Sequence, residues 1–193
     1  MSNYSKKDLD FFANKTLENY DSKNPSIIFK EKIKITNEDA LLIQSNVAEL
    51  RKKRGEEIAG YKIGCVSKDT QKKMGFTQPA CGYLWKNELY NSGVVLNKKN
   101  YSNPAMEAEF GIILNRDINP ELSSFDYILE SIEAIYPLIE IHNLIFHGDE
   151  PYGAELLTNN AIHAGVVLGL ETKFPTNKLE TDLKLIYDNE IID

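Results

Sequence analysis

The stretch Pro104-Ala105-Met106-Glu107-Ala108-Glu109-Phe110-Gly111-Ile112-Ile113-Leu114 places two carboxylates in a segment that otherwise has the composition of a buried strand. Side chains alternate between the two faces of a strand, so Glu107 and Glu109 share one face. Like charges at neighbouring positions repel, and burying them without compensation is unfavourable. Either this face lies in water, as on a half-exposed strand, or the carboxylates share a cation. Mg²⁺ or Mn²⁺ would then be suitable, because both take oxygen ligands.

A third carboxylate, Glu140, lies between Ile139 and Ile141 in the next apolar stretch, which predicts a strand over residues 135–142. Three glutamates from two adjacent strands would form one face of an octahedral site and leave the other positions to water and a chelating substrate. Glu140 could equally pair with a Lys or Arg of a neighbouring strand, so spacing alone leaves both interpretations open.

Lys62 is a charged residue within the short apolar segment 58–66, where glycines flank a predicted strand. Such a lysine can point into a cleft and act as an acid, a base or a charge stabiliser. Alternatively, its stem can follow the strand until the ammonium group reaches solvent. His142 and His163 are further candidate site residues, but their spacing indicates no metal site, which favours structural or supporting roles.

The composition suits one domain, or a domain with an N-terminal helical extension, since 42 % of the 193 residues are hydrophobic. The net charge of −7, with Lys and Arg scattered, argues against a nucleic-acid partner. No apolar run is long enough to cross a bilayer, so no membrane partner is expected. Cys65 and Cys81 are too few for a disulfide framework, and a signal-peptide pattern is absent from the first residues. A cytoplasmic location is therefore expected.

Helical patterns come before the acidic strand. Residues 1–21 and 40–54 have amphipathic periodicity, and Thr36 and Asp39 have capping-box spacing ahead of the second helix. After the acidic strand, the pattern predicts a helix over 125–134 and strands over 165–169 and 183–187, with a hairpin turn beginning at Asp188-Asn189.

Five motifs occur in the same order as in a known family. They are Asp39-Ala40-Leu41-Leu42-Ile43-Gln44, Gly60-Tyr61-Lys62-Ile63-Gly64-Cys65-Val66-Ser67-Lys68, Met106-Glu107-Ala108-Glu109-Phe110, Leu138-Ile139-Glu140-Ile141, and Asn160-Ala161 continuing to Gly169. Over roughly residues 33–193, the chain resembles the 2-keto-4-pentenoate hydratases of the fumarylacetoacetate hydrolase superfamily. An ordered series of motifs is more specific than any single one.

The resemblance implies a metal-dependent hydratase of aromatic-compound degradation, which turns 2-hydroxy-2,4-dienoates or 2-oxo-4-enoates into 4-hydroxy-2-oxo acids. Its implied site residues are Glu107, Glu109 and Glu140 as ligands of Mg²⁺ or Mn²⁺, Lys62 as the catalytic residue, and Ser67 and Asn160 as substrate-binding residues. Close relatives decarboxylate 4-oxalocrotonate or hydrolyse acylpyruvates with the same ligands. Those two reactions therefore stay open as alternatives.

The resemblance also implies an α+β fold. An N-terminal helical segment, residues 1–57, would pack on a mixed β-roll domain, residues 58–193, that carries the metal site. The family's chain continues through further strands, so a fragment or a shortened member with an incomplete roll is expected. Because an incomplete roll exposes a strand edge, we also expect a homo-oligomer.

Three positions depart from the family pattern. Ala80, Asn143 and Asn159 stand where relatives commonly carry Asp. Each departure removes a possible acid or base, although the two asparagines keep hydrogen-bonding capacity. A catalytically degenerate relative that retains a metal or ligand site is therefore a further alternative.

Overall fold

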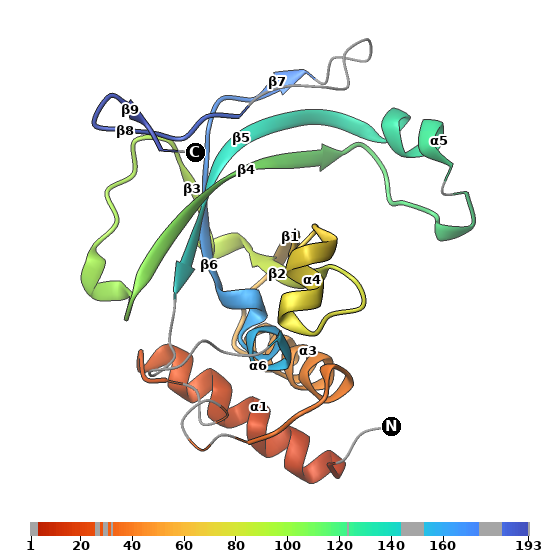
Figure 1. Ribbon diagram of the computed structural model, residues 1–193, viewed down its shortest axis with the longest axis vertical. Coiled ribbons are helices and arrows are strands. Elements are labelled where there is room, and N and C mark those ends of the chain that lie inside the picture. Colours follow the sequence, from red (N-terminus) through yellow and green to blue (C-terminus); the bar gives the residue numbers. More distant parts are fainter. Residues whose placement is uncertain are drawn as a thin grey trace. The chain divides into compact units, whose positions relative to one another are not determined.

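The computed structural model of the chain describes residues 4–25, 28, 31, 33–122, 124–143, 153–173 and 183–192. The chain forms two compact units (Figure 1). The first unit contains Met1–Leu89, Val95–Ala105 and His142–Gly165, and the second contains Tyr90–Val94, Met106–Ile141 and Val166–Asp193. The division into residues 1–57 and 58–193 stays a prediction.

Helices of the first unit begin at well-defined caps. α1 (Lys6–Asp21) begins after Ser5, which forms a capping box with Asp8, and α3 (Asn37–Lys53) begins after Thr36, which does the same with Asp39. Each box satisfies amide groups that the first helical turn leaves without partners. The predicted capping box at Thr36 is thus confirmed; of the first predicted helix, residues 1–3 lie outside the described part.

The core of the first unit lies between α1, α3 and α6 (Gly153–Thr158), which lie side by side in Figure 1. Their facing apolar side chains are buried, and the members of this cluster include Leu9, Phe12, Ala13, Ala40, Ile43, Ala154 and Leu157. α4 (Lys68–Met74) ends at Gly75, which has φ +71°. A left-handed glycine is the common way to end a helix.

The first unit also contains an antiparallel hairpin of β1 (Ile58–Gly64) and β2 (Ala80–Trp85). Lys62 is paired with Gly82, and Tyr61 with Tyr83. Because side chains alternate, Gly60, Lys62 and Gly64 share one face of β1. Lys62 therefore emerges on that face between two residues that have no side chains.

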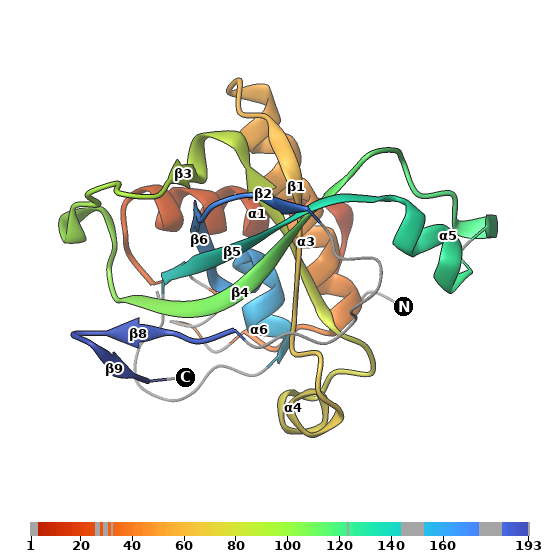
Figure 2. The same cartoon turned by 90° about the horizontal axis from the view of Figure 1, so that it is seen from above.

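The strands of the second unit belong to a five-stranded sheet with the order β3-β6-β5-β4, in which β7 also pairs with β5. The bounds are Leu89–Asn91 for β3, Pro104–Leu114 for β4, Ile132–Asn143 for β5, His163–Leu168 for β6 and Thr172–Lys173 for β7. β4 and β5 lie side by side (Figure 2). The predicted class, α+β with N-terminal helices and a mixed sheet, is confirmed.

Several elements differ from the predicted bounds: the strand predicted over 165–169 is β6, and only residues 186 and 187 of the one predicted over 183–187 form a strand. The helix predicted over 125–134 is α5 (Phe125–Glu130), and β5 already begins at Ile132. Ser131 ends this helix, since its hydroxyl donates to Tyr127 O at 2.7 Å and its amide bonds the last turn. Near the end of the chain, β8 (Ile186–Tyr187) and β9 (Glu190–Ile191) form a short hairpin.

The turn of that short hairpin is Asp188-Asn189, as predicted. Both residues have positive φ, which is typical of the tight turn that matches the twist of two paired strands.

Short 3₁₀ turns complete the described part: η1 (Lys86–Glu88), η2 (Lys98–Asn100), η3 (Pro120–Leu122) and η4 (Asn160–Ile162). Among the described residues, none of the helices combines the length and apolar character that a bilayer crossing requires.

Candidate metal and substrate site

Two neighbouring strands supply a group of three potential metal ligands. Glu107 of β4 and Glu140 and His142 of β5 each offer one ligand atom, and these atoms all lie within 4.8 Å of one another. Glu107 is exposed, whereas Glu140 is 1 % and His142 5 % exposed. Glu140 and His142 share a strand face because they are two residues apart. A buried carboxylate beside a second carboxylate is an arrangement that a cation would stabilise.

The chemistry of this group fits a divalent cation. Two carboxylate oxygens suit Mg²⁺, and a set that adds one imidazole nitrogen also suits Mn²⁺ and other first-row divalent ions. With three protein ligands, further coordination positions would remain for a chelating substrate. The residues present therefore fit the predicted cofactor.

Glu109 does not belong to that group of three. It is half-buried on β4, and strand alternation puts it on the same face as Glu107. Its role as a metal ligand stays a prediction, as do the assigned roles of Glu107 and Glu140.

Lys62 is buried, with 8 % of its surface exposed, so the alternative in which its stem reaches solvent does not apply. Its Nζ atom lies 3.5 Å from Nε2 of His142. A Cβ atom on Gly82, the residue paired with Lys62, would lie 3.2 Å from Cγ of Lys62, and one on Gly64 would lie 3.8 Å from its Nζ. Because both positions are glycines, the lysine side chain has space that larger side chains would occupy. Its catalytic role stays a prediction.

Ser67 and Asn160 both use their side chains within the protein. The hydroxyl of Ser67 accepts from the amide of Thr70 at 3.1 Å and caps α4. The side-chain amide of Asn160 accepts a hydrogen bond from the backbone N–H of Tyr83 and donates one to its carbonyl oxygen. Substrate binding by either residue stays a prediction.

The three positions that depart from the family pattern have identifiable structural roles. Asn143 is buried, and its Oδ1 accepts from the amides of Ser102 at 2.9 Å and Asn103 at 3.3 Å. Asn159 is also buried and donates to Glu155 O at 3.2 Å. Ala80 belongs to the apolar core of the first unit. None of these roles requires a carboxylate.

The sequence prediction missed His142 as a candidate ligand. The signal was available, because His142 follows Glu140 by two residues in a predicted strand and must share its face. Alternation pairs Glu107 with Glu109 on β4 in the same way. His163, also buried, is not in the group of three.

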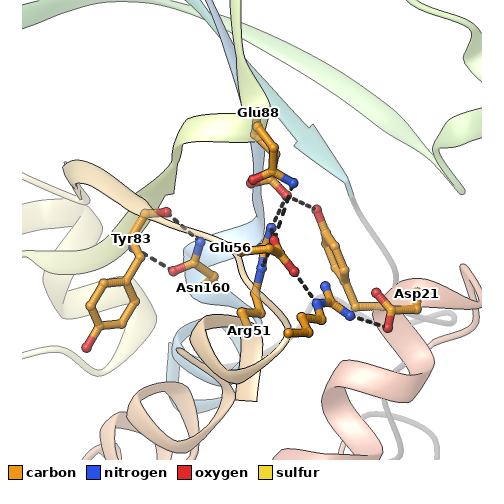
Figure 3. Close-up of polar contacts among 9 residues, drawn as sticks. Asp21, Arg51, Glu56, Tyr83, Glu88 and Asn160 are labelled. Atoms are coloured by element: carbon orange, nitrogen blue, oxygen red, sulfur yellow. Dashed lines mark hydrogen bonds and ion pairs between the residues drawn. The ribbon is translucent and has the colours of Figure 1, made fainter. Parts of the chain in front are cut away.

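A second polar cluster in the first unit is built around Arg51 (Figure 3). The guanidinium of Arg51 donates to Glu56 and to Glu88, each at 2.5 Å. Arg54 also donates to Glu56 and, at 2.6 Å, to Asp21 at the end of α1. Buried charges require such pairing, since desolvation of an unpaired ion is costly.

This cluster shifts several pKa values. Burial, reinforced by the charge of Glu88, raises the pKa of Tyr20, which donates to Glu88 at 3.2 Å. Burial alone would raise the pKa of Glu56, but hydrogen bonds from Arg51 and Arg54 outweigh it, so the pKa lies below its ordinary value. The cluster joins the ends of α1 and α3 to η1, which contains Glu88, and has the features of a structural ion network.

Comparison with known proteins identifies relatives. No protein-family model matches the chain. The 2-keto-4-pentenoate hydratase of Burkholderia vietnamiensis is 30 % identical over 130 residues, which are 67 % of this chain and 50 % of the relative. The 2-hydroxypent-2,4-dienoate hydratase of Pseudomonas putida is 35 % identical over 109 residues, 55 % of this chain and 49 % of the relative. The 2-oxo-hept-4-ene-1,7-dioate hydratase of Escherichia coli is 26 % identical over 170 residues, 82 % of this chain and 62 % of the relative.

A solved structure shares the fold. The 4-oxalocrotonate decarboxylase from Pseudomonas putida G7, complexed with magnesium and adipate, matches with a TM-score of 0.81 at 17 % identity, over 88 % of this chain and 65 % of that chain. The chain spans about half the length of the two hydratases first compared. The predicted resemblance is confirmed: over 55–82 % of its length, at about 30 % identity, this chain is a homologue of the 2-keto-4-pentenoate hydratases.

Proposed function

We propose that this chain carries the site of a hydratase-type lyase that depends on Mg²⁺ or Mn²⁺. The reaction adds water to 2-hydroxy-2,4-dienoates or 2-oxo-4-enoates and gives 4-hydroxy-2-oxo acids. One observation carries the proposal: a group of potential metal ligands, Glu107, Glu140 and His142, lies on the two strands that contain the acidic motifs by which the sequence resembles the hydratases. We further propose that the five-stranded sheet is part of the family's β-roll.

In this proposal Glu107 and Glu140 hold the cation, with Glu109 or His142 as a further ligand. A bound divalent ion would supply Lewis-acid polarisation of the substrate's carboxylate and 2-oxo group. Lys62 moves the proton that the change between enol and keto forms requires, and its charge stabilises the enolate. Nε2 of His142 lies 3.5 Å from Nζ of Lys62; a neutral imidazole that bound the cation through Nδ1 would carry its proton on Nε2 and could donate it to the Lys62 amine.

The test is a hydration assay with 2-hydroxypenta-2,4-dienoate, with and without added Mg²⁺ or Mn²⁺. The reaction is monitored by the loss of absorbance of the conjugated diene. We expect turnover that requires the metal and is abolished in Glu107→Gln and Glu140→Gln. Glu133→Gln is the matched control, because Glu133 is an exposed glutamate of β5 outside the group of three. Full activity of the Glu140→Gln variant would refute the metal site.

Product analysis separates the alternatives. A hydratase gives the 4-hydroxy-2-oxo acid, a decarboxylase releases CO₂ from 4-oxalocrotonate, and an acylpyruvate hydrolase cuts a carbon–carbon bond. Calorimetric titration with Mn²⁺ covers the remaining case: metal binding that requires Glu140, without turnover of any of the three substrates, would identify a catalytically degenerate relative. Homo-oligomeric assembly stays a prediction that sedimentation can measure on the same protein.

A further inference from the structure

Asn160 makes an unusual connection to the hairpin that carries Lys62. The amide of Tyr83 donates to Oδ1 of Asn160 at 2.6 Å, and Nδ2 of Asn160 donates to Tyr83 O at 2.8 Å (Figure 3). Both backbone groups of Tyr83 are thus bound by one side chain from 77 residues further along the chain. The Asn160 amide takes the place that a third strand would occupy beside β2.

The contact continues from Asn160 to Lys62 through Gly82. A Cβ atom on Gly82 would lie 2.7 Å from Asn160 O, 3.0 Å from Asn160 Oδ1 and 3.2 Å from Cγ of Lys62. Gly82 is also the residue that pairs with Lys62 across the hairpin. Gly82, whose side chain is a single hydrogen atom, therefore lies between Asn160 and the stem of Lys62.

The backbone around Asn160 is strained. Asn160, Ala161 and Ile162 have φ values of 55°, 50° and 60° in succession. This left-handed region is unfavourable for most side chains, and asparagine tolerates it better than alanine or isoleucine. Such strain persists where the surroundings hold it, often at functional sites. Here the two bonds to Tyr83 hold the turn.

We propose that Asn160 is a positioning residue that fixes β2 at Tyr83 and, through Gly82, keeps the stem of Lys62 in its productive place. The catalytic part of this inference rests on the proposed function of Lys62. An asparagine combines the two properties needed, since glycine would adopt the turn without bonding Tyr83. The two bonds to Tyr83 use one N–H and one lone pair of the Asn160 amide and fix its orientation.

The experiment compares Asn160→Gly, which keeps the left-handed backbone and removes the amide, with Asn160→Asp, which keeps an acceptor for the Tyr83 amide. We expect Asn160→Gly to lower kcat by about 10- to 100-fold with KM changed less than about twofold. Asn160→Asp should restore part of this loss. Asn46→Ala is the control, because Asn46 donates to Asp10 at 3.0 Å elsewhere in the first unit. Its kcat should equal that of the wild type.

Two NMR readouts do not depend on turnover. In Asn160→Gly the Tyr83 amide should exchange with solvent faster, and the nuclear Overhauser contact between Gly82 and the Lys62 stem should weaken. A raised KM with unchanged kcat would overturn the proposal in favour of direct substrate binding. If the wild type has no hydratase activity, the proposed function fails, and the NMR contact alone decides whether Asn160 positions Lys62: its retention in Asn160→Gly would overturn the inference.

Discussion

The guanidinium carbon of Arg51 lies 4.2 Å from the centroid of the Trp85 ring. The same atom lies 5.6 Å from the centroid of the Tyr20 ring, and the guanidinium nitrogens bond Glu56 and Glu88. One buried cation thus meets two aromatic faces and two carboxylates from separate parts of the first unit. This arrangement has direct consequences for stability.

Replacing Arg51 with Ala should lower the free energy of unfolding by about 3–5 kcal/mol, because the carboxylate of Glu88 would be left buried without its partner. Lys52→Ala is the control. Lys52 is the next residue and forms an exposed ion pair with Glu49, which is worth about 1 kcal/mol or less. Urea unfolding of both variants measures the difference. Equal losses would mean that the Arg51 network contributes no more than a surface pair.

The depressed pKa of Glu56 predicts a loss of stability in acid. A carboxyl group whose pKa is lower in the folded state contributes stability above its ordinary pKa of 4.5, and this contribution disappears as pH falls through the folded-state value. Wild-type protein should therefore lose more stability between neutral pH and pH values below 4.5 than Glu56→Gln does. Denaturant titrations across that range test this. Glu57→Gln is the control, since the neighbouring Glu57 is exposed and bonds Lys86; parallel profiles for wild type and Glu56→Gln would contradict the prediction.

Gly82→Ala should destabilise the protein by about 1–3 kcal/mol, because its Cβ would meet the backbone oxygen of Asn160 at 2.7 Å and force the hairpin or the turn to move. Gly60→Ala is a matched substitution on the same hairpin, where the new Cβ would meet Leu84 at an ordinary 3.6 Å. Its stability should be unchanged or slightly higher. Thermal unfolding of the pair provides the measurement, and a larger loss in Gly60→Ala would show that the close approach at Gly82 is relieved at little cost.

Lys62→Met should reduce hydration of 2-hydroxypenta-2,4-dienoate by about 10²- to 10⁴-fold, the range for loss of a general acid or base. Methionine keeps much of the buried stem, so folding should be preserved. Lys68→Met is the control, because Lys68 is an exposed lysine at the start of α4. Binding of Mn²⁺ measured by calorimetry should persist in both variants. Undiminished turnover in Lys62→Met would remove the lysine from the mechanism.

Local signals in the sequence predicted the beginnings of elements well. The capping box of Thr36 and Asp39 is confirmed because it depends on residues three positions apart. The Asp188-Asn189 hairpin turn follows in the same way from the turn preferences of two adjacent residues. The predicted end of α5 was wrong by several positions. Ser131 stops the helix through its contact with Tyr127, and the apolar residues that follow suit a helix and a strand equally well.

Contacts between distant parts of the chain were harder to predict. The bonds between Asn160 and Tyr83 span 77 residues, and the network of Arg51 joins segments around residues 20, 56 and 88. Neither of these interactions is indicated by a pattern of residues close together in the sequence. The left-handed turn at Asn160–Ile162 runs against the preference of Ala161 and Ile162, so local propensity argues against it. The shared face of Glu140 and His142 was predictable from alternation, but the proximity of His142 to Lys62 was not.

The first unit is discontinuous, and this has a consequence for synthesis on the ribosome. α1 and α3 leave the ribosome early, yet Ala154 and Leu157 of α6, which complete their core, are translated much later. Until then, the apolar faces of the two early helices lack their final cover. Between the synthesis of these helices and that of α6, the nascent chain is therefore expected to need protection from aggregation, for example by a chaperone.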